Sequence, residues 1–219
     1  MFEYQYNIEA ETLPSGRTYF TPDGKFPSIT TILGKTANQT WLQAWKDRVG
    51  EEEANRISKK ATDRGTLIHE YAERYFNSEE IFIDLVKESS DVIQMSKDLI
   101  RITESGVEEI WGQEQILWNN KLCYAGRCDM VGIWNGIPSI IDFKTSKKTK
   151  YIKQIKDYFI QCCAYAVAHN QMFGTGIRNI VILITVDGKD PQCFETSAVP
   201  FLSDLKLRIN EYDKMFPPF

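Results

Sequence analysis

The chain has 219 residues and a mass of 25.3 kDa, enough for one domain of ordinary size or slightly more. With 42% hydrophobic and 26% charged residues, its composition excludes disordered, fibrous and collagen-like classes, and no apolar run reaches the ~18 residues of a membrane span. The net charge is −4 at pH 7, yet segment 143–156 carries six lysines and no acidic residue. A mildly acidic protein can therefore still bind phosphate through this segment.

The first half of the sequence predicts turns followed by helices. Turn signals at Pro14-Ser15-Gly16 and Pro22-Asp23-Gly24, with aromatic residues beside them, predict a small hairpin. A helical pattern follows from 51 to 76, and Gly65 predicts a break between two helices there. The second of these helices has an apolar face made by Leu67, Ile68, Tyr71, Ala72 and Tyr75. Another helix is expected from 91 to 110.

Two tryptophans precede these helices at helical spacing. Trp41 and Trp45 lie four residues apart, so they share one helix face. Stacking against unpaired bases is one interpretation of this pair. Core packing is the one that we favour.

From about residue 111 the pattern changes to strands. Asn135-Gly136 is the strongest hairpin signal in the chain, and Asn119-Asn120-Lys121 is a second turn. The expected elements are strands at 115–118, 122–133 and 137–143, a helix at about 153–170, strands at 177–186 and near 194–199, and a helix at 201–215. We therefore predict one α/β domain over 1–219, with a mainly helical extension at 1–110 and an α/β core at 111–219.

Three neighbouring predicted strands each carry a carboxylate. Asp142 and Lys144 are two apart on one strand, so both side chains emerge on the same face. Asp129 interrupts an apolar strand, and Glu114 begins the strand before it. Taken singly, the Asp142–Lys144 pair fits a strand-end salt bridge and Asp129 a turn or bulge acid. Together the four charges favour a site for magnesium or manganese that hydrolyses phosphodiesters, because these ions bind clustered carboxylates.

The order of these residues resembles a known nuclease superfamily. A glutamate, Gly-x-x-Asp, Asp-x-Lys and then Gln-x-x-x-Tyr on the next helix form the signature of the PD-(D/E)XK nucleases. This chain has Glu114, Gly126–Asp129, Asp142–Lys144 and Gln161–Tyr165 in that order. It is most similar to the RecB-type exonuclease branch and, within it, to the genome maintenance exonuclease group with phage and bacterial members. Segments 27–33 and 64–70 add to this similarity.

The resemblance implies a fold and a role for each residue. The fold would be restriction-endonuclease-like, with a mixed central sheet flanked by helices and a helical N-terminal extension that arches over the site. Asp129 and Asp142 would bind the metal, together with the backbone carbonyl of Phe143. Glu114 and His69 would be further metal ligands. Asp129 and Asp142 would also be catalytic. Lys144 would position or activate the attacking water. Gln161 and Tyr165 would support the lysine, water or phosphate.

The resemblance also implies cofactors and partners. We expect one or two Mg²⁺ or Mn²⁺ ions and no iron–sulfur cluster, since no cysteine precedes Cys123 and no late cysteine triplet exists. Single-stranded DNA is the expected substrate, contacted by Thr145, Ser146, Lys147 and Lys148. Replication or recombination proteins are candidate partners, and a membrane is not. Without a signal or transit peptide at its start, the chain is expected in the cytoplasm of a bacterium or a phage-infected host.

Two other functions remain open on the sequence alone. An endonuclease or flap-cleaving enzyme would use the same residues. A non-catalytic subunit that binds DNA ends within a recombination or replication complex would keep the fold. Retention of the lysine and both aspartates favours the enzyme, which would be a metal-dependent DNA exonuclease serving replication, recombination or repair.

Overall fold

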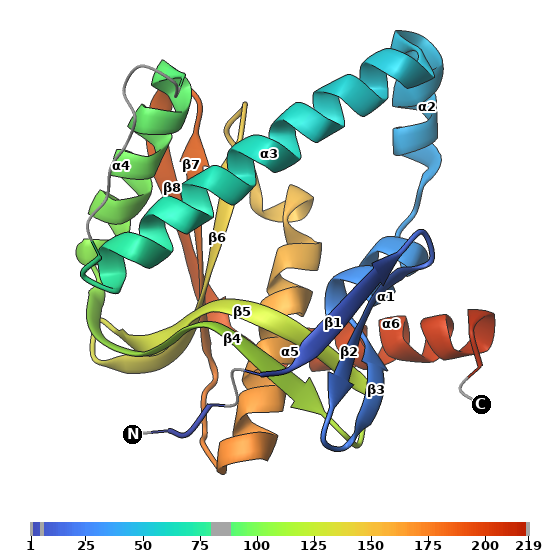
Figure 1. Ribbon diagram of the computed structural model, residues 1–219, viewed down its shortest axis with the longest axis vertical. Coiled ribbons are helices and arrows are strands. Elements are labelled where there is room, and N and C mark those ends of the chain that lie inside the picture. Colours follow the sequence, from blue (N-terminus) through green and yellow to red (C-terminus); the bar gives the residue numbers. More distant parts are fainter. Residues whose placement is uncertain (1, 5–6, 80–88, 218–219) are drawn as a thin grey trace.

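The computed structural model of the chain describes residues 2–4, 7–79 and 89–217. Two sheets and six α-helices make up the described part (Figure 1). The N-terminal sheet is antiparallel and has the order β1 (Glu9–Leu13), β2 (Gly16–Thr21), β3 (Gly24–Pro27). The larger sheet has the order β4 (Val107–Asn119), β5 (Tyr124–Trp134), β6 (Ile137–Ser146), β7 (Asn179–Val186), β8 (Lys189–Ser197).

The larger sheet is mixed. β6 and β7 pair in parallel, and the other three neighbouring pairs are antiparallel. The parallel pair requires a crossover, which is provided by the short 3₁₀ helix η1 (Ile152–Gln154) and α5 (Lys156–Phe173). The other helices are α1 (Ile29–Thr36), α2 (Thr40–Val49), α3 (Glu51–Phe76), α4 (Ser90–Glu104), α6 (Leu202–Met215) and the 3₁₀ helix η2 (Val199–Phe201). A mixed α/β architecture with a central sheet is thus confirmed.

Helices cover both faces of the larger sheet. One core layer joins α1, α5 and α6 to alternate residues of β7, such as Ile180 and Ile182. The other layer joins α3 and α4 to the intervening residues, such as Val181 and Leu183. This alternation is what a period-two strand buried on both faces requires, and it explains why β7 is almost entirely apolar.

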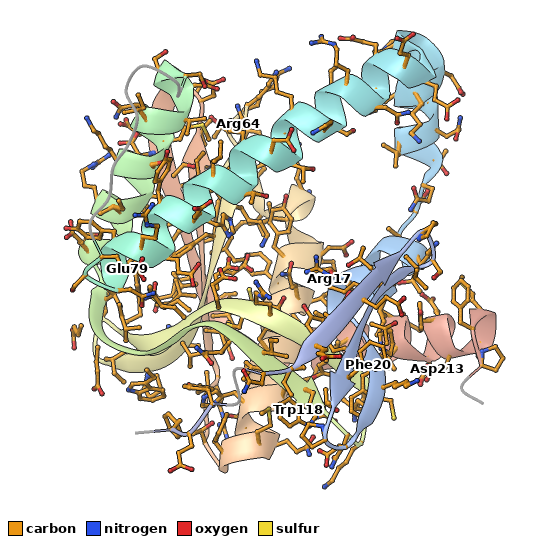
Figure 2. All side chains as sticks on the ribbon, viewed as in Figure 1. Arg17, Phe20, Arg64, Glu79, Trp118 and Asp213 are labelled. Atoms are coloured by element: carbon orange, nitrogen blue, oxygen red, sulfur yellow. The ribbon has the colours of Figure 1, made fainter. Side chains whose placement is uncertain are left out.

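Polar contacts connect the peripheral elements to this core. The Trp118 indole donates to Asp23 at 2.8 Å, which attaches the small sheet to β4. Arg64, labelled in Figure 2, is buried on α3 and lies 3.6 Å from both Asp91 and Asp187. It thereby connects α3 to the start of α4 and to the turn between β7 and β8.

The structure corrects three expectations in the first half of the chain. α3 runs without interruption through Gly65, so the predicted break is wrong. The helix expected to reach 110 ends at Glu104, and β4 already begins at Val107. The expected small hairpin is part of a three-stranded sheet, in which β2 pairs with both β1 and β3.

The interpretation of Trp45 also changes. Its side chain is half-buried and belongs to none of the three buried apolar clusters, so the favoured core packing is wrong for this residue. The side chain of Trp41 lies outside the described part. Over residues 2–4, 7–79 and 89–217, we find no helix with the length and hydropathy needed to traverse a bilayer.

Candidate active site

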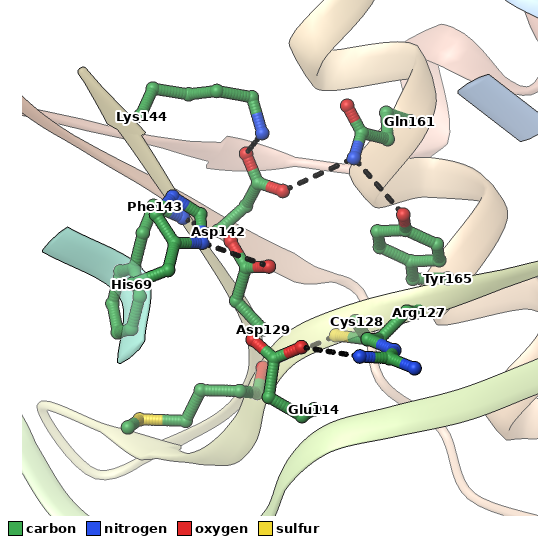
Figure 3. A network of polar contacts seen from close by, with 11 residues as sticks. His69, Glu114, Arg127, Cys128, Asp129, Asp142, Phe143, Lys144, Gln161 and Tyr165 are labelled. Atoms are coloured by element: carbon green, nitrogen blue, oxygen red, sulfur yellow. Dashed lines mark hydrogen bonds and ion pairs between the residues drawn. The ribbon is translucent and has the colours of Figure 1, made fainter. Parts of the chain in front are cut away.

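Asp129 lies where β5 separates from β6. The pairing between these strands runs from Trp134 and Ile137 to Met130 and Ile141 and then stops. Beyond that point the Asp129 carboxylate accepts a hydrogen bond from the Phe143 backbone N–H at 2.7 Å. The side chain therefore takes over a contact that a strand neighbour would otherwise make. This local separation of two strands exposes the carboxylate's other oxygen to the α3 side of the sheet (Figure 3).

His69 reaches this oxygen from α3. Its Nδ1 lies 3.6 Å from Oδ1 of Asp129, and its ring meets the Phe143 ring edge-on at 5.9 Å between centroids. Burial alone would lower the pKa of His69, but the negative charges of Asp129 and Asp142 outweigh it and raise the pKa. Burial would likewise raise the pKa of Asp129, yet His69, Lys144 and the Phe143 N–H together lower it.

Glu114 completes a group of three possible metal ligands. One donor atom each from His69, Glu114 and Asp129 lies within 4.8 Å of the others. Glu114 has a φ of +50°, which is strained for a residue other than glycine and is typical of functional sites. Burial and the nearby Asp129 raise its pKa to about 7. His69 and Arg127 oppose this rise without cancelling it, so the two carboxylates would be stabilised by a cation bound between them.

Asp142 and Lys144 lie on β6 and face α5. Asp142 is fully buried and forms an ion pair with Lys144, as i and i+2 spacing predicts. Gln161 donates to Asp142 at 3.3 Å and to the Tyr165 hydroxyl at 3.0 Å. The four residues form one chain of contacts, drawn with dashed lines in Figure 3.

The charge states in this chain follow from burial and proximity. Burial raises the pKa of Asp142, as does Asp129, although Lys144 opposes both effects. Burial would lower the pKa of Lys144, but Asp142 and Asp129 together raise it. Lys144 is therefore an ammonium ion at neutral pH. In this state it can donate hydrogen bonds and neutralise negative charge, but it cannot accept a proton.

The structure thus brings together the predicted residues in two adjoining groups. The first group lies on the α3 side of the sheet and consists of His69, Glu114 and Asp129. The second lies on the α5 side and consists of Asp142, Lys144, Gln161 and Tyr165. The backbone of β6 joins the groups, because the Phe143 N–H contacts Asp129 while its neighbours belong to the second group. Asp142 lies outside the three-ligand group in this arrangement, and its role as a metal ligand stays a prediction.

The four residues predicted to contact DNA follow directly on β6. Lys147 and Lys148 are exposed, and Thr145 is half-buried and faces Gly65 of α3. Ser146 is buried and its hydroxyl contacts both the carbonyl and the N–H of Lys148, so it shapes the loop. The two lysines are thus accessible to phosphate, whereas the Ser146 side chain is occupied.

Two features beside the metal-ligand group were not foreseen. Arg127 lies 3.7 Å from Glu114 and is half exposed. It shares a strand face with Asp129 by i and i+2 spacing, which is the signal that could have identified it. A cavity of about 490 Å³ adjoins this pair, between the end of α3 and β4, lined among others by Glu73, Gln113, Glu114 and Arg127.

Comparisons with known proteins identify distant relatives of the chain. It is 28% identical to human mitochondrial genome maintenance exonuclease 1 over 176 residues, which cover 75% of this chain and 49% of that protein. It is 24% identical to the same exonuclease from Xenopus tropicalis over 209 residues, or 88% and 58% of the two chains. The chain is a distant homologue of this exonuclease.

These matches do not extend over the full length of the two relatives. The chain spans about half the length of the curated relatives it matches. The crystal structure of a candidate exonuclease from Eubacterium rectale overlaps with 69% of this chain and 68% of its own, at 14% identity and a TM-score of 0.47. A comparison with models of known protein families returned no match.

Proposed function

We propose that the protein is a metal-dependent DNA exonuclease of the PD-(D/E)XK type with a restriction-endonuclease-like core. The observation that carries this proposal is the group of His69, Glu114 and Asp129 next to the Asp142–Lys144 pair. Distant homology to an exonuclease supports it. We infer that the substrate is single-stranded DNA with free ends, and that the activity serves replication, recombination or repair.

The residues present fit a hard divalent cation such as Mg²⁺ or Mn²⁺. The group offers an imidazole and two carboxylates, and the pKa of Glu114 is raised to about 7 by burial and by Asp129, which a cation would reverse. His69, Glu114 and Asp129 would hold the ion, with Asp142 a further ligand on the adjoining side. When bound, the ion would polarise a phosphoryl oxygen and lower the pKa of a water molecule.

The other residues act on charge and orientation. The Lys144 ammonium would neutralise negative charge that develops on the phosphate, since its raised pKa keeps it protonated. Gln161 holds Asp142 on the side opposite the lysine and is itself fixed by Tyr165. Its amide thereby fixes the orientation of the carboxylate that pairs with Lys144. Lys147 and Lys148 would contact backbone phosphates.

The test uses purified protein and single-stranded DNA labelled at the 5′ or the 3′ end. Duplex and closed circular single strands run beside it, each in Mg²⁺, Mn²⁺ or EDTA. Asp129→Asn and Lys144→Ala should each reduce cleavage by at least about 100-fold. Asp98→Asn is the matched control, because Asp98 pairs with Arg101 on α4 and belongs to neither group.

Metal-dependent shortening of linear strands, absent on circles, is the expected result, and the labels would give the polarity of digestion. Cleavage of circles would assign an endonuclease instead. If the wild-type protein binds DNA ends but cuts nothing under any metal, the enzymatic proposal fails and the end-binding subunit replaces it.

A further inference from the structure

The two most exposed large apolar side chains among the described residues are neighbours in the sequence. Tyr151 is 71% exposed and Ile152 is 65% exposed. Both lie in the connection between β6 and α5, which leaves β6 only a few residues after Lys144 (Figure 1). Single exposed apolar side chains are ordinary, but an adjacent pair in the segment that follows the strand of Asp142 and Lys144 indicates a ligand surface.

The backbone beneath this pair is held in place. Lys150 exchanges two hydrogen bonds with the Gln192 side chain, at 2.8 and 3.0 Å. The Tyr151 N–H donates to Gln154 at 2.9 Å, and Ile155 is buried in the core immediately afterwards. Since the backbone is already ordered, a ligand that contacts the Tyr151 ring does not have to order the loop as well.

The charges around the pair identify the kind of ligand. The same segment carries Lys147, Lys148, Lys150 and Lys153, and within the described part of the chain none of the four forms an ion pair. Lys156, by contrast, pairs with Asp204 at 2.8 Å. Unpaired lysines contact phosphates, and an exposed aromatic ring stacks against bases. The combination is typical of surfaces that bind an unpaired nucleic-acid strand.

We propose that Tyr151 is a base-stacking residue for an unpaired nucleic-acid strand, with the four lysines contacting that strand's phosphates. The proposal rests on the proposed function and assigns a substrate-binding surface beside the candidate active site. Ile152 follows the ring in the chain and is exposed as well. A duplex offers no free base face to this ring, because its bases are already stacked on one another. Tyr151 therefore favours unpaired strands over duplex.

Equilibrium binding without cleavage tests this directly. The full chain is titrated into fluorescently labelled oligothymidylate of about 20 nucleotides in EDTA, at several salt concentrations. Tyr151→Ala should weaken binding by about fivefold to a hundredfold, and Tyr151→Trp should preserve it. Tyr75→Ala is the matched control, because Tyr75 is also exposed but lies on α3 and donates to Glu104.

Two further readouts separate stacking from charge. On a strand of the same length without bases, Tyr151→Ala and wild type should bind equally, because the partner of the ring is gone. Tyr151→Ala should keep the wild-type salt dependence, whereas Lys147→Ala/Lys148→Ala should reduce the slope of log K against log salt by about 1.4. Parallel titrations with RNA strands and with duplex show which nucleic acid the surface accepts.

The outcomes are distinguishable from those of the proposed function. If wild type cuts and binds single strands but Tyr151→Ala binds them equally well, this proposal is wrong and the proposed function stands. An equal loss with and without bases, or an equal loss on duplex, would also overturn stacking. If wild type neither cuts nor binds, the proposed function itself fails.

Discussion

Glu114 should destabilise the metal-free protein. Its pKa is raised from 4.5 to about 7 by burial and by Asp129. At about 1.4 kcal/mol per pH unit, this corresponds to at most about 3.5 kcal/mol, and the side chain's 22% exposure leads us to expect about 2–3 kcal/mol. Since the folded state holds the proton more tightly than the unfolded state, stability is lost as pH rises from about 4.5 to about 7.

Glu114→Gln removes this cost, and urea denaturation in EDTA should reveal the gain. The variant should match wild type near pH 4.5 and become about 2–3 kcal/mol more stable above about pH 7.5. Glu108→Gln, on an exposed position of the same strand, should show no such trend. A gain that is the same at every pH, or no gain, would refute this account of Glu114.

Manganese should close the gap in stability between the two proteins. A ligand at 100 times its Kd stabilises the folded state by about 2.7 kcal/mol, and wild type should gain this when its carboxylates bind the ion. Glu114→Gln should gain much less, because an amide oxygen carries no charge. If the variant keeps the full metal-dependent rise in stability, Glu114 is not a ligand.

Three further changes test the packing and charge of the site and its surroundings. Lys144→Ala leaves the buried Asp142 without its cation, so urea denaturation should show a loss of about 3–5 kcal/mol in the free energy of unfolding. A smaller loss for Asp142→Asn/Lys144→Met would confirm that the unpaired charge is the cause. His169 is buried and neutral, and burial lowers its pKa to about 4. Stability should therefore fall by at most about 3.5 kcal/mol between about pH 6.5 and pH 4, and His169→Gln should flatten that profile. A Cβ at Gly126 would lie 2.7 Å from a core tyrosine ring, so Gly126→Ala should lower the free energy of unfolding by about 1–3 kcal/mol in thermal or urea denaturation. Gly176→Ala should change it little, because nothing lies within 4 Å of that position.

The strands and their turns were predictable because their signals are local. Asn135 and Gly136 have φ values of +46° and +77°, the conformation that an Asn-Gly hairpin turn demands. The apolar run of β7 and the turn after it were likewise visible in the sequence. Strand ends were less accurate, since β4 begins eight residues before the expected start at 115. That early part of β4 is irregular and only half-buried, so it lacks the alternation on which the prediction depended.

The parts of the site that follow from the alternation of side chains along a strand were predictable from the sequence. The parts that follow from tertiary geometry were not. Asp142 and Lys144 meet because i and i+2 share a face. The hydrogen bond from the Phe143 N–H to Asp129 arises only because two strands separate at that point. The left-handed backbone of Glu114 has no signal in the sequence either, because glutamate rarely adopts it.

The wrong prediction at Gly65 shows how α3 positions His69. A glycine inside a helix costs about 1 kcal/mol, which is small beside the burial of Ile68 and Ala72 on the same helix. α3 passes β6 at contact distance here, because a Cβ on Gly65 would make an ordinary van der Waals contact of 3.5 Å with the Thr145 hydroxyl.

That contact fixes the position of the histidine one turn later. Four residues of helix rise by about 6 Å, and two residues of strand span about 7 Å. Because α3 and β6 pass in opposite directions here, the contact of Gly65 with Thr145 is followed by that of His69 with Phe143. A break at Gly65 would uncouple the two contacts. The uninterrupted helix instead holds His69 at the height of the Phe143 N–H, where Asp129 lies between the helix and the separated strands.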